Sequence, residues 1–538
     1  MRTHRLVLLF LPVAWAGGAV GAAAQDCLQL TDGRFVSGPK MTRKADGVTI
    51  HLDSGDVVVP KSMVKVASVS ATDAGAEEAD TPEAIKNKEK GLVEFEGKWI
   101  RPDARDALLA KRNGLMQGRI AEAMAHSEWR NAYQTESKYF KFEYTIDPEI
   151  MKYWADLMDG YASNFMSFWR VRQSPTFGKL HVMFHHNPEK FYELTGMPEG
   201  VGGFFRFVPP LELQFYFDRL DTDWTMNVMF HEANHYLLWL VDPHFRYPPW
   251  LNEGLAEYYG ASVWNEKSKK LDVGGLLEGR VAQVQQDIIE DKWVTLQELT
   301  TQPHPIGGEY YGWAWTFVHF MLNSKYKEAF RKFVIGLPKD GSLKTTRESF
   351  GEWSMEFAPP DQVQNSLKRN LRVSDLTALD KEWHGYIKNL KPSSGRGYFT
   401  FGRTALGNGM PIKAKRMFEI ALEKGYESPQ VFSYYARALT RVPAKNREEH
   451  EKNLEEAKTQ YEKVLAMDPI SPLDRVEYAR LLNQLAKLRR KADPEVTKQI
   501  DLAKALGRCV EGGMWDYDVF LSTSLLKPYE DGTADDGK

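Results

Sequence analysis

The sequence predicts an α+β protein with a small β domain at its N-terminal end and an α-helical repeat region at its C-terminal end. Three observations lead to this fold class. Residues 27 to about 70 alternate apolar and polar side chains in short runs, as half-buried strands do. Strand-like runs precede helical runs from residue 138 to 395. Two similar helical segments then recur between residues 400 and 525.

The length and composition limit the classes of protein to which the chain can belong. With 538 residues the chain is too long for one hydrophobic core, so we expect three or four domains. Hydrophobic residues make up 43% and charged residues 27%, as in ordinary soluble proteins. The net charge of -3 is too near zero to indicate a nucleic-acid partner.

Residues 1–24 have the pattern of a secretory signal peptide. Arg2 and Arg5 precede a short apolar stretch from residue 6 to 20, and small residues lead to a cleavage site after Ala24. We therefore expect an exported protein, periplasmic or secreted, without a transmembrane span once the signal is removed. Lipidation of Cys27 and an uncleaved anchor are the alternatives.

The chain has only two cysteines, Cys27 and Cys509, near opposite ends of the mature protein. The sequence does not determine whether they pair. Neither cysteine stands in a metal-binding or nucleophile motif.

The N-terminal elements read in order as strands, a linker and helices. Residues 25–70 are predicted to form the small β domain, with an SH3-like barrel as the expected architecture, in which Asp32-Gly33 supplies turn chemistry. Residues 71–82, "ATDAGAEEADTP", are small and acidic and indicate a linker. Residues 83–137 form a mostly helical connecting segment.

The central region, residues 138–395, begins with strands. "SKYFKFEYTI" and "KLHVMFHH" indicate strands separated by a long helix, and "NPEKFYELTG" indicates a short helix capped by Asn187. Residues 211–217 alternate apolar and polar side chains, which predicts a half-exposed strand. Residues 280–395 are predicted to be mostly helical.

The C-terminal region, residues 396–528, contains a degenerate repeat. "AKRMFEIALEKGYESP" starts at Ala414, and "AKTQYEKVLAMDPISP" starts 43 residues later. This offset equals the about 34-residue period of tetratricopeptide repeats plus an insertion, "RVPAKNREE". The segments resemble tetratricopeptide repeats, which implies a possible protein partner. Residues 529–538 are expected to be disordered.

The chemistry of the chain concentrates in "FHEANHYLLWLVDPHFRYPPWLNEGLAEYYG". On a helix, His231 and His235 share one face and can hold one metal ion, while Glu232 lies about 100° around the axis. Two imidazoles leave a tetrahedral zinc ion one protein ligand short. Glu253, on a second helix, can supply that ligand, and Glu257 can accept the free N–H of a ligand histidine. We therefore predict a site for one Zn²⁺ ion.

The two motifs together resemble those of the gluzincin metallopeptidases, which include thermolysin-like enzymes and zinc aminopeptidases. The chain looks like a bacterial peptidase-like branch with tetratricopeptide-like repeats. The resemblance implies a thermolysin-like zinc peptidase domain over residues 138–395. It also implies that His231, His235 and Glu253 are zinc ligands, that Glu232 is the general base, and that Glu257 orients a ligand.

The resemblance further implies a residue that stabilises the oxyanion. In the aminopeptidase branch a tyrosine follows the glutamate ligand by about 60 residues, and Tyr311 in "GGEYYGWAWTFVHFML" is favoured over Tyr310. The alternative is that both tyrosines only pack; His304 and His319 are weaker candidates. The GxMEN strand of that branch is missing, and "GVGGFFRF" occupies its place, so aminopeptidase specificity is not implied. An exposed strand there could instead pair with an extended peptide.

We therefore expect an extracytoplasmic zinc metallopeptidase that acts on a peptide or protein substrate. In this mechanism Glu232 takes a proton from a zinc-activated water and later passes it to the leaving amine, while zinc and Tyr311 stabilise the oxyanion. Two alternatives remain: an interaction scaffold that acts through its repeats and β domain, or a zinc hydrolase that acts on another class of substrate.

Overall fold

The computed structural model describes residues 26–31, 34–69, 71–72, 81–173, 175–218, 222–265, 267–392, 394–511 and 526. The predicted signal peptide, residues 73–80 of the predicted linker and the predicted tail lie outside the described residues. The chain divides into two compact units. One holds the described residues up to Gly114 together with Cys509–Glu511, and the other holds Leu115–Arg508 and residue 526.

The chain is a mixed α+β protein with a C-terminal helical region, as the sequence predicts. Helices make up 56% of the structure and strands 17%. Within the described residues, no helix combines the length and the apolar character that crossing a membrane requires.

The smaller unit is built mainly from short strands. One sheet has the order β19-β2-β1-β6 and the other has the order β5-β4-β3-β7. The strands are β1 (Cys27–Leu30), β2 (Phe35–Ser37), β3 (Lys40–Lys44), β4 (Gly47–Leu52), β5 (Gly55–Pro60), β6 (Val64–Ser68), β7 (Ala71–Thr72) and β19 (Val510–Glu511). A helix, a hairpin and a second helix follow β7: α1 (Pro82–Glu89), β8 (Val93–Phe95), β9 (Lys98–Ile100) and α2 (Pro102–Ala125).

The two cysteines belong to this unit, and both are buried and free. Cys27 pairs with Ser37 of β2, while Cys509 directly precedes Val510, which pairs with Val36 on the other side of β2. A whole strand therefore separates the cysteines, and two strand spacings of about 4.8 Å exceed the reach of a disulfide. Burial also raises the pKa of the Cys509 thiol to about 12, so this thiol is unreactive.

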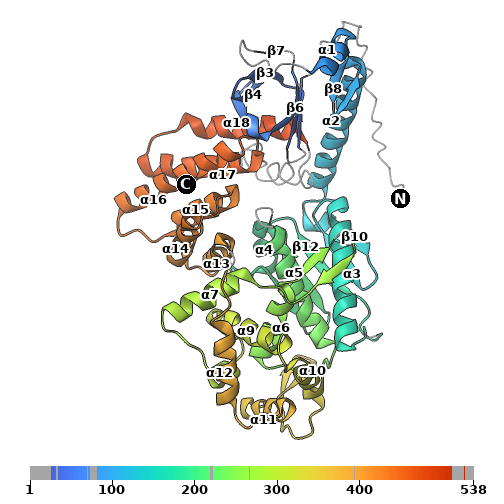
Figure 1. Ribbon diagram of the computed structural model, residues 1–538, viewed down its shortest axis with the longest axis vertical. Helices are drawn as coiled ribbons and strands as arrows, with labels where there is room; N and C mark the ends of the chain where they lie inside the picture. Colours follow the sequence, from blue (N-terminus) through green and yellow to red (C-terminus); the bar gives the residue numbers. More distant parts are fainter. Residues whose placement is uncertain are drawn as a thin grey trace, which may run out of the picture. The chain divides into compact units, whose positions relative to one another are not determined.

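The larger unit begins with a five-stranded sheet of order β10-β11-β12-β14-β13 (Figure 1). Strands β11, β12 and β14 run parallel, and β10 and β13 are antiparallel edge strands. The elements are β10 (Tyr133–Glu136), β11 (Phe140–Tyr144), α3 (Pro148–Trp169), β12 (Leu180–His185), α4 (Pro188–Thr195), β13 (Gly203–Arg206) and β14 (Glu212–Tyr216). The strand predicted at residues 211–217 is present as β14, but it is more buried than predicted. Gln214 and Tyr216 are buried as well as the apolar residues, and both α4 and α5 pack against the strand.

Three helices follow the sheet and position the candidate site: α5 (Thr222–Trp239), α6 (Pro249–Gly260) and α9 (Tyr311–Leu322). Pro249 occupies the first turn of α6, where its fixed φ favours a helix start and its missing N–H costs nothing. Helix α6 packs against both α5 and α9. At Gly254, a Cβ atom would lie 2.7 Å from the Ala314 carbonyl oxygen, so only glycine permits this close approach of α6 to α9.

The region after α6 is mostly helical but contains two short hairpins. Its elements are β15 (Val263–Asn265), β16 (Lys270–Asp272), α7 (Glu278–Ile289), α8 (Leu296–Thr300), α10 (Lys327–Gly336), β17 (Thr346–Phe350), β18 (Trp353–Phe357), α11 (Pro360–Leu371) and α12 (Leu376–Ile387). The β17–β18 hairpin departs from the predicted helical content. Gly351, with φ of +66°, makes its turn, and the Trp353 ring stacks on His244 at 4.5 Å.

The C-terminal helices stack as antiparallel neighbours (Figure 1). They are α13 (Gly395–Gly407), α14 (Pro411–Glu423), α15 (Pro429–Arg441), α16 (Arg447–Met467), α17 (Pro472–Arg489) and α18 (Pro494–Cys509). Both repeat segments fall on consecutive helix pairs, α14–α15 and α16–α17. Of the insertion "RVPAKNREE", only the last three residues lie in α16, which begins after the N-cap Asn446. Helix α13 packs against α7 of the preceding region.

Candidate metal centre

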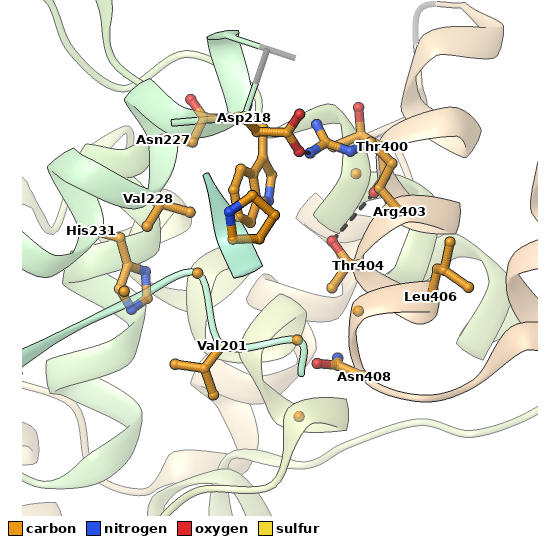
Figure 2. Close-up of a pocket in the computed structure, with 18 of the residues that line it drawn as sticks. Val201, Asp218, Asn227, Val228, His231, Thr400, Arg403, Thr404, Leu406 and Asn408 are labelled. Atoms are coloured by element: carbon orange, nitrogen blue, oxygen red, sulfur yellow. Dashed lines mark hydrogen bonds and ion pairs between the residues drawn. The ribbon is translucent and has the colours of Figure 1, made fainter. Parts of the chain in front are cut away.

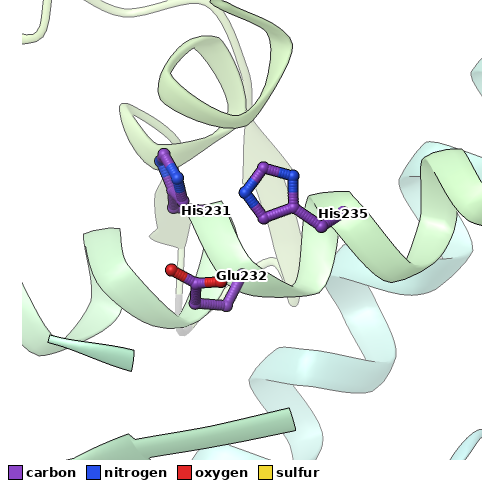
Figure 3. A group of neighbouring side chains, drawn as sticks. All are labelled: His231, Glu232 and His235. Carbon is purple, nitrogen blue, oxygen red and sulfur yellow. The ribbon is translucent and has the colours of Figure 1, made fainter. Parts of the chain in front are cut away.

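Helix α5 brings three candidate metal ligands together (Figure 3). One ligand-type atom from each of His231, Glu232 and His235 lies within 4.8 Å of the other two, so this triad could hold a metal ion. The two histidines are four residues apart and therefore occupy one face of the helix. Both side chains are largely buried, with exposed fractions of 15% and 14%.

Helix α6 adds a carboxylate to this cluster. Glu253 Oε2 lies 3.2 Å from His231 Nε2 and 3.6 Å from His235 Nε2. In a tetrahedral zinc site with bonds of about 2.0–2.2 Å, neighbouring ligand atoms lie about 3.3–3.6 Å apart. The two distances from Glu253 Oε2 are therefore compatible with metal coordination, and two imidazoles with one carboxylate are a common donor set for a divalent metal ion.

Glu257, one turn further along α6, contacts the opposite edge of the first imidazole. Its Oε1 lies 3.5 Å from His231 Nδ1. Arg280 of α7 forms two hydrogen bonds with the Glu257 carboxylate. Its Nε donates to Oε2 at 2.9 Å, and its Nη2 donates to Oε1 at 2.5 Å. Arg280 also donates to the Gln283 side chain at 3.1 Å. No local motif in the sequence marks Arg280 as a residue of this site.

Burial and charge set the protonation of these groups in the metal-free protein. Burial alone would lower the pKa of His231, but the hydrogen bond with Glu253 and the nearby carboxylates raise it to about 9. Burial alone would raise the pKa of Glu253, but the His235 charge and the hydrogen bond from His231 lower it to about 2. Burial raises the pKa of Glu232. In the metal-free protein, Glu253 and the nearby carboxylates therefore favour the protonated form of His231.

The metal-free protein is expected to lose stability as the pH rises through 9. The pKa of His231 is raised from 6.5 to about 9, so its contribution is complete below pH 6.5 and disappears above pH 9. The loss should be of order 3 kcal/mol in the free energy of unfolding. Denaturant unfolding of chelator-treated protein between pH 6 and 10 measures it. His231→Gln should flatten the profile, and an equally steep profile in that variant would contradict this assignment.

The two tyrosines named from the sequence occupy different surroundings. The Tyr311 ring stacks on the His231 ring at 6.2 Å between centroids, and the Arg280 guanidinium lies 5.3 Å from the Tyr311 ring centre. The Tyr310 hydroxyl donates to Glu298 Oε1 at 2.9 Å. Of the two, only Tyr311 lines the cavity beside the metal centre.

The two weaker histidine candidates lie outside this cavity. Both ring nitrogens of His319 have partners, the Tyr386 hydroxyl at 2.7 Å and the Gly274 carbonyl at 3.2 Å, so His319 is a satisfied core histidine. The His304 ring lies edge-on to Phe357, and burial lowers the pKa of His304 to about 4.

A cavity of about 540 Å³ opens beside the metal centre (Figure 2). His231, Glu232, Glu257, Arg280 and Tyr311 line one side of it. Helices α13 and α15 line another side, and Figure 2 shows Thr400, Arg403 and Thr404 across the cavity from His231. The sequence predicts the helical repeats, but nothing in it indicates that they face the metal centre.

No protein-family model, curated protein or solved structure matches this chain. Its function is therefore inferred from the residues of the site and their geometry.

Proposed function

We propose that this chain is a zinc-dependent metallopeptidase with a gluzincin-type centre in a thermolysin-like domain, residues 138–395. The observation that carries the proposal is the position of Glu253, whose Oε2 approaches the Nε2 atoms of His231 and His235 from a separate helix. If the sequence HEANH at residues 231–235 occurred only by chance, a largely buried carboxylate from another helix would not be expected at ligand distance from both histidines. The signal-peptide pattern supports an exported enzyme.

His231, His235 and Glu253 would hold the zinc ion. Glu253 is preferred over Glu232 as the third ligand because it has one oxygen close to both Nε2 atoms. Zinc in such a site supplies Lewis acidity and lowers the pKa of a water molecule that it binds. Glu257, whose Oε1 lies 3.5 Å from His231 Nδ1, would accept the Nδ1 proton, which would leave the Nε2 lone pair free for the metal.

Glu232 would be the general base. Its pKa is raised by burial, and a carboxylate with a raised pKa both accepts a proton from water and returns it readily. The side chain lies against β13: a Cβ atom on Gly203 would come within 3.2 Å of Glu232 Cγ. Glu232 therefore stands between the metal ligands and an edge strand, where it can transfer the proton of the attacking water to the leaving amine.

The edge strand supports a peptide as the substrate. Strand β13 is hydrogen-bonded to β14 on one side and has no strand neighbour on its other side among the described strands. An extended peptide can add to such an edge through main-chain hydrogen bonds. This would hold the scissile bond beside Glu232.

Tyr311→Phe is expected to lower kcat by about 10²–10³-fold while leaving the zinc content unchanged. The tyrosine hydroxyl would donate to the oxyanion, and removal of one such donor costs about that factor. Steady-state kinetics and metal analysis on the same preparation measure both quantities. Tyr310→Phe is the matched control, because that hydroxyl bonds Glu298 instead. A full-rate Tyr311→Phe enzyme would remove Tyr311 from the mechanism.

The proposed function is tested by incubating the purified full-length chain with a diverse peptide library and identifying the products by mass spectrometry. We expect about one zinc ion per chain and discrete cleavage products. A chelator should abolish cleavage, and added zinc should restore it. Intact peptides after incubation with the zinc-loaded protein would contradict the proposal.

A further inference from the structure

The cavity beside the metal centre is closed on one side by the C-terminal helices. Arg403 of α13 donates to Asp218 at 2.6 Å, with exposed fractions of only 4% and 14% for the two side chains. Arg441 of α15 pairs with Glu199 at 3.1 Å. These ion pairs attach α13 and α15 to the segments on either side of β13 and β14. On this side of the cavity, a substrate would therefore contact α13 and α15 and not open solvent.

Four arginines line this cavity, and three of them have a carboxylate partner. Arg280 pairs with Glu257, and Arg403 and Arg441 pair as described above. Arg437 of α15 differs, because within the part of the chain that the structure describes its guanidinium makes no hydrogen bond or ion pair. It contacts only the face of Tyr434, at 5.4 Å from the ring centre.

The surroundings of Arg437 keep it charged and half-buried. Burial would lower its pKa, but the negative charge of Glu477 and the smaller influence of Asp218 raise it. Neither carboxylate lies within ion-pair distance of Arg437. The guanidinium therefore keeps its charge while its N–H donors lack an acceptor among the described residues, and a planar guanidinium that borders a cavity matches the two oxygens of a carboxylate.

We propose that Arg437 binds a carboxylate of the substrate, so that the enzyme prefers short peptides that carry a carboxylate at the end lying in this cavity. The inference rests on the proposed peptidase function. A cavity of about 540 Å³ closed by helices suits a short segment of peptide rather than the middle of a folded protein. The carboxylate can belong to the C-terminus of the peptide or to an Asp or Glu side chain.

The test uses the full-length, zinc-loaded chain and three probes with the same core sequence: a hexapeptide with a free C-terminal carboxylate, its C-terminal amide, and the amide with one added glutamate. For Arg437→Gln we expect kcat/KM to fall about 10–100-fold on the probe whose carboxylate Arg437 binds, either the free acid or the glutamate amide. On the plain amide, kcat/KM should change little. Loss on the free acid identifies the terminus, and loss on the glutamate amide identifies the side chain.

Two further variants separate recognition from general charge and from folding. Arg437→Lys keeps the charge but not the two-pronged geometry, and should retain part of the preference. Arg480→Gln removes an equal charge from the exposed face of α17, outside the cavity, and should keep the full preference. Equal losses on all probes with Arg437→Gln, or the same loss with Arg480→Gln, would overturn the proposal.

A binding measurement separates this inference from the proposed function. The same probes are titrated calorimetrically into Glu232→Gln protein with and without Arg437→Gln. Weaker binding of only the carboxylate probe supports the role of Arg437, even if the wild-type chain hydrolyses no peptide. Hydrolysis of all probes by wild type, with binding that ignores both the carboxylate and Arg437, would keep the peptidase function and overturn this inference.

Discussion

Glu232→Gln is expected to abolish peptide hydrolysis while the chain still binds about one zinc ion. Glutamine has nearly the same volume and keeps an oxygen acceptor, but it cannot accept a proton from water. General-base catalysis contributes about 10²–10⁴-fold, so kcat should fall by at least that factor. Glu232 is partly buried on α5 beside His231, and desolvation already disfavours its charged form, so a neutral amide at this position should not disturb the fold.

The measurement pairs single-turnover hydrolysis of one library substrate with metal analysis of the same sample. Glu189→Gln is the matched control: it removes a carboxylate that lines the same cavity but lies on α4, at an exposed position. It should keep the wild-type rate and zinc content. If Glu232→Gln lost its zinc together with its activity, Glu232 would be a metal ligand, as its place in the His–Glu–His triad also permits.

The parts of this site that sequence alone predicts are the local ones. The four-residue spacing of His231 and His235 fixes one helix face, and Pro248-Pro249 predicts where α6 begins. The structure brings Glu253 to these histidines, as the sequence pattern requires. Even here, the packing of α6 on α5 was inferred from the need for a third ligand, because periodicity says nothing about which helices meet.

The parts that sequence does not predict depend on long-range packing. Arg280 reaches Glu257 only because α7 and α6 both pack against α9, and an arginine in an amphipathic helix ordinarily indicates a solvent-exposed face. Arg437 is separated from His231 by about two hundred residues and meets the same cavity only because α13 and α15 pack there. Strand β19 likewise joins β2 from the far end of the chain.

The β17–β18 hairpin is a local feature that the sequence does not predict. Residues 346–357 contain charged and aromatic side chains in a pattern that fits a helix or a hairpin equally well. Two residues favour the hairpin. Gly351 has a positive φ that permits the tight turn, and Trp353 stacks on Trp239 and His244, which are distant in the sequence. Tertiary aromatic contacts therefore select the strand conformation here.

Glu253→Gln and Glu257→Gln are expected to rank in one order for their loss of zinc binding and in the reverse order for their loss of stability. Glu253 Oε2 faces the Nε2 atoms of both histidines, so its loss should remove a direct ligand and weaken zinc binding by more than about 100-fold. Glu257 faces only Nδ1 of His231, so its loss should weaken zinc binding by about 10–100-fold and leave the metal in place at micromolar zinc. Competition titration with a chromophoric chelator measures both affinities.

In contrast, Glu257→Gln should lower the free energy of unfolding more than Glu253→Gln does. Glu257 is the carboxylate partner of Arg280, and both side chains are largely buried, so Glu257→Gln leaves a buried guanidinium without its counter-charge. Breaking such a pair costs about 3–5 kcal/mol in the free energy of unfolding, whereas the ion pair of Glu253 with His231 exists only below the His231 pKa of about 9. Denaturant unfolding of the metal-free variants at about pH 10, where His231 is neutral, measures this difference. If Glu257→Gln instead lost its zinc and Glu253→Gln kept it, the two carboxylates would exchange roles, and Arg280 would be holding the metal ligand itself.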